Sequence, residues 1–284
     1  MKNLNKFLFV FIAIFFISSC KKDDSSSNNN GKTCSVSKIT LTDFSNKQQI
    51  INFNYDSNNN LNSVLRFDLS SSQDTTRAEL TYSNNKLTKI IYRNISANDI
   101  YAYDSLIYNG SNQLTEIKSY EMQYVAPTNY FDLINDDTYS YNTSNKIIRK
   151  TQYHKNSSPP DALDTLNIYY NTANNIDSIR SLGHYKTKYE FSYNANVMKL
   201  NIGNIIGLTG KGQGAVFSEL FQEDFLFGNN LGISSVIISD ALSGVYGTTN
   251  FSYTYNTDGY ITNMTTNNDK YWDIKTMTIE YVCK

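Results

Sequence analysis

Side chains able to carry out catalysis are few and scattered in this sequence. The two histidines are His154 and His184, and no further ligands are spaced to complete a metal site around them. Asp136 and Asp137 are adjacent, whereas the paired carboxylates of a hydrolase must face each other across a substrate. The serines occur without a nucleophile-elbow motif. We therefore expect no catalytic residue, no metal and no cofactor.

Aromatic side chains are the remaining candidates for a binding site. The chain has 23 Tyr, 15 Phe and 1 Trp. Tyr271 and Trp272 are adjacent, and Tyr101 and Tyr103 form a second pair. Exposed aromatic faces can stack on sugar rings or anchor protein contacts. Core packing is the alternative, and for Trp272 it is the one we favour because of the size of this side chain.

Cys20 follows a segment typical of export. Lys2 and Lys6 precede an unbroken apolar run over residues 7–17. This run suits the core of a signal peptide better than a transmembrane helix, which needs about 20 such residues. Ile17 to Cys20 resembles the lipobox, in which the cysteine is acylated and becomes the new N-terminus. We expect residues 1–19 to be a lipoprotein signal peptide, with an ordinary secretory signal as the alternative.

Residues 20–33 are interpreted as the acylated cysteine and a flexible tether. The Ser/Asn run that ends near Gly31 has almost nothing to bury. Lys21 to Asp24 (KKDD) resembles the surface-export signal of Bacteroidetes lipoproteins. This resemblance implies an outer-membrane lipoprotein that faces the medium, and the periplasmic face is the alternative.

Cys34 and Cys283 are the remaining cysteines, one near each end of the folded region. In an oxidising compartment this even pair indicates a disulfide, with two free buried thiols as the alternative. The chain has 25 basic and 26 acidic residues and no basic block. A nucleic-acid partner is therefore not expected.

A pattern of aromatic residues recurs along the chain and indicates strands. Each repeat aromatic has another apolar residue two positions before it, as period-2 alternation with one buried face requires. The repeat aromatics are Tyr55, Tyr82, Tyr108, Tyr141, Tyr170, Tyr193, Phe227 and Tyr255.

The turns after these aromatics have regular chemistry. In five repeats the fourth residue after the aromatic tolerates the left-handed conformation of a tight hairpin. These residues are Asn59, Asn112, Asn145, Asn174 and Gly259. Asp or Asn directly after the aromatic can close an Asx-turn. Apolar pairs spaced by three, such as Leu61 and Val64, then require either packing over the turn or a β-bulge.

The predicted fold class is therefore all-β. We expect a long antiparallel meander of about eight repeated hairpins, curled or superhelical, over a single domain at residues 34–284. Residues 201–226 interrupt the repeat. Their glycine-rich start and the helical spacing that follows predict a loop and one short helix.

Tyr55-Asp56-Ser57-Asn58-Asn59-Asn60-Leu61 and residues 255–261 look like degenerate YD repeats. With the lipobox, the chain resembles the YD-repeat-like, or Rhs-like, lipoproteins of Bacteroidetes. This resemblance covers residues 35–284 and implies a fold, not an activity.

These observations favour a non-enzymatic surface or envelope lipoprotein with a binding or structural role. Its partners would be a membrane, through the lipid on Cys20, and a glycan or protein ligand near Trp272, Tyr271, Tyr101 and Tyr103. An extracellular polymer hydrolase with a site near residues 201–227 is the alternative. A periplasmic assembly factor is a third hypothesis.

Overall fold

Sixteen strands form one antiparallel sheet. The computed structural model describes residues 34–69, 75–125, 128–155, 162–182, 186–197, 231–240, 244–267 and 274–284. The strands are β1 (Cys34–Asp43), β2 (Gln48–Tyr55), β3 (Leu61–Asp68), β4 (Thr75–Ser83), β5 (Lys86–Asn94), β6 (Asp99–Tyr108), β7 (Leu114–Gln123), β8 (Tyr130–Tyr141), β9 (Ile147–His154), β10 (Ala162–Tyr170), β11 (Ile176–Ser181), β12 (Thr187–Val197), β13 (Leu231–Asp240), β14 (Gly244–Tyr255), β15 (Ile261–Thr266) and β16 (Ile274–Cys283).

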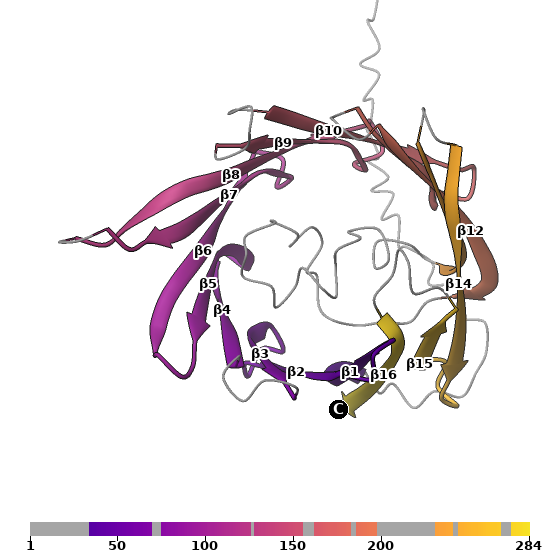
Figure 1. Cartoon of the computed structure of the whole chain (residues 1–284), viewed down its shortest axis with the longest axis horizontal. Helices are drawn as coiled ribbons and strands as arrows, with labels where there is room; N and C mark the ends of the chain where they lie inside the picture. Colours follow the sequence, from indigo (N-terminus) through magenta and orange to yellow (C-terminus); the bar gives the residue numbers. More distant parts are fainter. Residues whose placement is uncertain are drawn as a thin grey trace, which may run out of the picture. The chain divides into compact units, whose positions relative to one another are not determined.

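Each strand pairs with its neighbours in sequence, and β1 also pairs with β16, so the sheet closes into a barrel (Figure 1). The predicted fold class, a curled or superhelical meander with a helical insertion, is therefore wrong. An open sheet leaves unpaired N–H and C=O groups along β1 and β16, and closure pairs these groups with each other. No helix occurs among the described residues, and the predicted insertion at 201–226 lies outside them. The described residues accordingly contain no helix that could span a membrane.

Alternation along the strands separates an inner from an outer face. In β4, Ala78 and Leu80 are buried, while Glu79 is half-buried and Thr81 is exposed. A closed single-layer sheet can cover only its inner face, so the buried side chains point into the barrel. The core consists of aliphatic and aromatic residues of this inner face, from Val36 and Ile39 on β1 to Met277 and Ile279 on β16.

The hairpin turns at one end of the barrel have the predicted conformation. Five residues predicted to be left-handed have positive φ: Asn59 (63°), Asn112 (66°), Asn145 (61°), Asn174 (64°) and Gly259 (79°). The Asx-turns are also confirmed, because Oδ1 of the residue after the tyrosine accepts backbone N–H bonds, as Asp56 does from Asn58 at 2.9 Å.

A β-bulge precedes these turns and explains the spacing of the apolar pairs. The register shifts between Asn54 and Tyr55, and Tyr55 then lies opposite Leu61. Leu61 and Val64 are both buried as a result. The bulge interpretation is confirmed.

The strand ends form two rims. We call the tyrosine rim the end where β2, β4, β6, β8, β10, β12 and β14 each finish and connect to the next strand, and where β16 finishes beside the start of β1. The loop rim is the opposite end, with the connections that follow β1, β3, β5, β7, β9, β11, β13 and β15.

Candidate functional site

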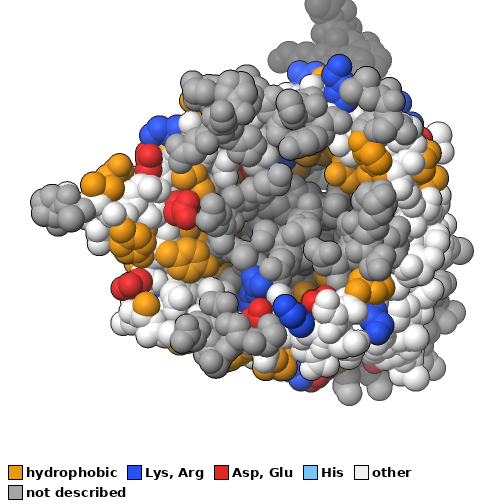
Figure 2. Space-filling model, viewed as in Figure 1, with side chains coloured by type: hydrophobic (Ala, Val, Ile, Leu, Met, Phe, Trp, Pro, Cys, Tyr) orange, Lys and Arg blue, Asp and Glu red, His pale blue; other side chains and the backbone are white. Residues whose placement is uncertain are grey.

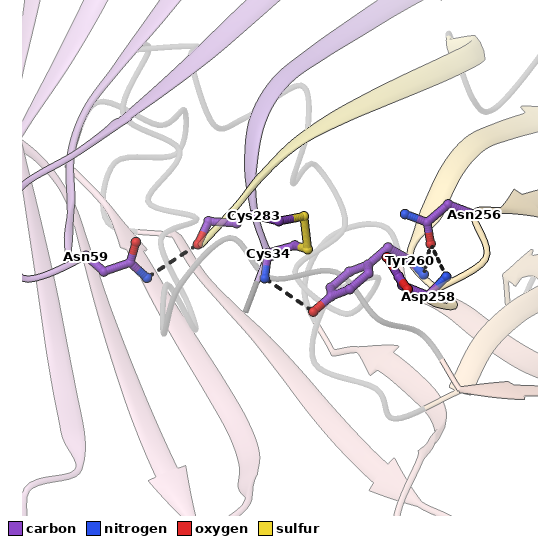
Figure 3. Close-up of a disulfide and its surroundings, with 7 residues drawn as sticks. Cys34, Asn59, Asn256, Asp258, Tyr260 and Cys283 are labelled. Atoms are coloured by element: carbon purple, nitrogen blue, oxygen red, sulfur yellow. Dashed lines mark hydrogen bonds between the residues drawn. A yellow bond between two sulfur atoms is a disulfide. The ribbon is translucent and has the colours of Figure 1, made fainter. Parts of the chain in front are cut away.

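Cys34 and Cys283 lie opposite each other on β1 and β16 and form a disulfide at the tyrosine rim (Figure 3). The Cys34 N–H donates a hydrogen bond of 3.4 Å to Oη of Tyr260, in the turn between β14 and β15. Asn59, in the turn between β2 and β3, donates one of 3.4 Å to Oγ of Ser35. The disulfide thus joins β16 to β1 at a position where the neighbouring strand pairs, β14–β15 and β2–β3, are each joined by a turn.

A ladder of tyrosine hydroxyls runs around the same rim. Each donates to a backbone carbonyl at the start of a strand in the preceding strand pair: Tyr55 to Val36, Tyr82 to Leu61, Tyr108 to Leu87, Tyr141 to Leu114, Tyr170 to Ile147, Tyr193 to Ile176, Tyr253 to Ile233 and Tyr281 to Ile261. Burial raises the pKa of Tyr55 and of Tyr170 to about 12. The hydroxyls are therefore protonated donors at neutral pH.

Sequence reasoning missed two members of this ladder. Tyr281 was not recognised as a repeat position, although Ile279 lies two residues before it as in the other repeats. Tyr253, not the predicted Tyr255, makes the bond to Ile233 at 2.8 Å. The ladder explains the repeat spacing as a structural device, since each tyrosine fastens one hairpin to the one before it.

A second group of polar residues faces into the barrel on β5 to β9, and we call it the inward polar cluster. Tyr92 donates a hydrogen bond of 2.7 Å to Oδ2 of Asp104. Nζ of Lys150 lies 3.0 Å from Oδ2 of Asp137, with side-chain exposures of 8% and 1%. Gln152 is also buried, and lies opposite Asp137.

Burial favours the protonated form of one carboxyl of this cluster, that of Asp104. It raises the pKa of Asp104 to about 6, although hydrogen bonds from Ser119 and Tyr92 act in the opposite direction. Asp136 and Asp137, which are neighbours in sequence, lie on opposite faces of β8, where Asp137 is buried and Asp136 is half-buried. They cannot act as paired carboxylates. Among the described residues, no group of three His, Cys, Asp or Glu could hold a metal ion.

The outer face of the barrel carries charged pairs. Lys38 pairs with Glu280 at 2.8 Å across β1 and β16, and Glu79 pairs with Arg93 at 3.0 Å across β4 and β5. These residues alternate with buried apolar ones on the same strands, so their charges face away from the core. A lipid-facing wall has an apolar outward band, which charged pairs of this kind interrupt.

One outward surface is aromatic and contains the predicted residue Tyr103. The rings of Tyr103 and Tyr120 stack at 4.5 Å, and the edge contact between Tyr103 and Phe131 spans 5.0 Å. Nζ of Lys89 lies 4.3 Å from the centroid of Tyr103. We call Tyr103, Tyr120, Phe131 and Lys89 the outward aromatic group. Figure 2 shows hydrophobic side chains gathered on this side of the barrel, toward the projecting ends of β7 and β8.

The other predicted site residues have different positions. Tyr101 does not join the outward aromatic group but packs against the core, near Tyr92 at a centroid distance of 6.4 Å. Cys20, Tyr271 and Trp272 lie outside the described residues, as does the insertion to which the hydrolase alternative was assigned.

Similarity to known proteins is found in the structure and not in the sequence. No protein-family model matches the sequence, and no curated protein matches it. A porin-like protein from Bacteroides uniformis ATCC 8492 has a similar structure, with a TM-score of 0.51 and 15% identity over 88% of this chain and 98% of that chain. The fold is similar to that of a porin-like protein. A second porin-like protein, from Bacteroides vulgatus ATCC 8482, is 13% identical over 88% of this chain and 99% of that chain, with a TM-score of 0.35.

These findings correct the resemblance to YD-repeat-like lipoproteins. The tyrosine-containing repeats belong to a closed barrel that is similar to a porin-like protein, so the resemblance is wrong. The Tyr-Asp and Tyr-Asn turns imitate YD repeats because any hairpin with a bulge, an Asx-turn and a left-handed residue needs the same residue types.

Proposed function

We propose that this chain is an outer-membrane lipoprotein whose barrel stays in water, held to the membrane by a lipid on Cys20. The observation that carries the proposal is the polarity of the wall: charged pairs such as Glu79–Arg93 face outward and the apolar core faces inward. A cationic side chain on a lipid-facing strand costs about 2–4 kcal/mol at the bilayer midplane, and acidic ones cost less. An acyl anchor needs no such insertion.

Membrane fractionation of cells that express Cys20→Ala tests this proposal. We expect the wild-type protein to sediment with membranes after an alkaline carbonate wash, and the variant to stay soluble with its Cys34–Cys283 disulfide intact. Ser19→Gly is the matched control, since it changes the neighbouring residue but keeps the thiol, and it should stay with the membrane. The fraction that decides the test is the Cys20→Ala protein from which residues 1–19 have been removed, because the apolar run over residues 7–17 would itself hold the membrane. If this barrel resists the wash, the strands themselves hold the membrane and the proposal is overturned.

Protease treatment of intact cells tests which side of the membrane the barrel faces. The KKDD sequence after Cys20 supports the cell surface. We therefore expect external protease to release the domain. Full protection would assign it to the periplasm and favour a role in envelope assembly.

We further propose that the barrel acts by binding, through the outward aromatic group. The contacts of Tyr103 favour a protein ligand over a glycan. Its ring stacks on Tyr120 and lies under the ammonium group of Lys89, so its faces are already in contact with other side chains. A sugar needs a free aromatic face for stacking, whereas a protein can pack against the ring edges and the neighbouring Phe131.

Two experiments test this binding role. A photo-reactive residue in place of Met122, which lies opposite Phe131, should crosslink a partner protein in intact cells. The same residue in place of Thr254, an exposed position on β14, should not. A glycan-array signal that disappears in Tyr103→Ala would instead identify a sugar ligand and overturn the preference for a protein.

A further inference from the structure

The loop rim carries exposed apolar side chains around much of its circumference. They lie at or beside five of its eight connections: Leu69 follows β3, Ile95 follows β5, Tyr124 follows β7 and Tyr130 begins β8, Leu182 follows β11, and Val245 is the second residue of β14. Leu69, Leu182 and Val245 are 57%, 61% and 67% exposed. Side chains this exposed to solvent are not part of the barrel core.

The tyrosine rim has a different character. Its short described turns consist mostly of Asn, Asp, Ser and Gly, such as Asn109 to Asn112 and Asn142 to Asn145. Exposed apolar residues near this rim include Ile107, Ile148 and Val282, which lie on strands and are 38%, 37% and 53% exposed. Among the described residues, exposed apolar side chains are thus more numerous at the loop rim than at the tyrosine rim.

A ring of aliphatic and tyrosine side chains on loop ends suits the surface of a lipid bilayer. Tyrosine favours the boundary between headgroups and acyl chains, where its ring is buried and its hydroxyl stays in water. Apolar area that is spread around a rim fits a flat surface better than it fits a single protein segment, which needs a continuous groove.

The length of the tether allows the loop rim to reach a membrane. Residues 21–33 are 13 residues between Cys20 and Cys34, which together span up to about 45 Å when fully extended. A 10-residue strand such as β1 rises only about 33 Å, and tilting shortens its height along the barrel axis. An anchor whose tether joins the barrel at the tyrosine rim can therefore hold the loop rim against the same bilayer.

We propose that the loop rim docks on the bilayer surface, with Leu69, Leu182 and Val245 inserted at the headgroup boundary. The inference rests on the proposed lipoprotein anchor, which keeps a bilayer within reach. The anchor supplies attachment, and the rim sets the orientation: the tyrosine rim points away from the membrane.

Vesicle flotation of the chain from Lys21 to Lys284 tests the rim without the anchor. This segment contains every described strand of the closed, disulfide-linked barrel. The probes are phosphatidylcholine vesicles and vesicles of phosphatidylethanolamine with phosphatidylglycerol. We expect the wild-type barrel to float with both. The triple variant Leu69→Ser, Leu182→Ser, Val245→Ser should bind at least tenfold more weakly.

The triple variant Ile107→Ser, Ile148→Ser, Val282→Ser is the matched control, because it removes three aliphatic side chains near the other rim. It should float like the wild type. Equal flotation of the two variants, or no flotation of the wild type, would overturn the docking proposal. So would self-association through the rim, seen as a larger species in sedimentation that the rim variant abolishes. None of these outcomes affects the anchor, which the Cys20→Ala fractionation tests separately.

Discussion

Tyr281 donates a hydrogen bond of 2.7 Å to the backbone carbonyl of Ile261, and this bond brings the last strand into the tyrosine ladder. The disulfide between Cys34 and Cys283 then connects β16 to β1 where the other strand pairs of this rim have a chain connection. The barrel is consequently a ring of similar strand pairs, one of which is joined through sulfur instead of through the chain.

Removing one ladder hydroxyl should destabilise the barrel. Tyr141 donates a 2.7 Å bond to the carbonyl of Leu114, which Tyr141→Phe would leave without this donor. We expect a loss of about 1–2 kcal/mol in the free energy of unfolding, measured by urea denaturation. Tyr169→Phe is the control, because Tyr169 is exposed and its contact with Arg180 involves the ring. Equal stability of Tyr141→Phe and wild type would show that the ladder bonds contribute nothing net.

The disulfide should contribute a large share of stability. It joins residues 249 positions apart, and closing so long a loop contributes up to about 5 kcal/mol in the chain-entropy model. We expect dithiothreitol to lower the urea midpoint of the wild type. The double variant Cys34→Ser, Cys283→Ser should have the urea midpoint of the reduced wild type, and dithiothreitol should not change it. A midpoint that is the same in both redox states would show that strand pairing alone closes the barrel.

The buried carboxyl of Asp104 should make stability depend on pH. Burial penalises the charged form and raises its pKa from the ordinary 3.8 of an aspartate to about 6 in the barrel. The folded state therefore binds this proton more tightly than the unfolded state does. The resulting stabilisation is fully present below pH 3.8 and is lost as the pH rises through 6.

Asp104→Asn should remove this dependence. The shift corresponds to about 3 kcal/mol, so we expect the wild type to lose stability relative to the variant by about that amount between pH 3 and pH 8. Paired urea titrations across this range measure the difference. Parallel curves for the two proteins would mean that Asp104 titrates normally.

The left-handed turn positions should tolerate glycine better than alanine. Asn174 has a φ of 64°, a conformation that costs an alanine about 1–2 kcal/mol. We expect Asn174→Ala to lose about 1 kcal/mol in thermal or urea unfolding, whereas Asn174→Gly should remain near wild type. If both variants lose the same amount of stability, the side-chain contacts of Asn174, and not its backbone conformation, would explain its contribution to the free energy of unfolding.

The sequence alone determined the local features of this protein. The bulge at Tyr55, the Asx-turn of Asp56 and the positive φ of Asn59 follow from residues within about six positions, because turn conformation depends on nearby backbone and side-chain groups. Alternation of apolar residues likewise assigned the buried face. No distant contact was needed for these predictions.

Closure of the sheet, and the contacts of its tyrosines and acids, depend on tertiary structure. Closure depends on the pairing of β1 with β16, whose residues are separated by nearly the whole chain. The Tyr92–Asp104 and Lys150–Asp137 contacts depend on the register between strands, which period-2 alternation leaves open. A repeat pattern specifies each hairpin, but the number and twist of the strands decide whether the ends of the sheet meet.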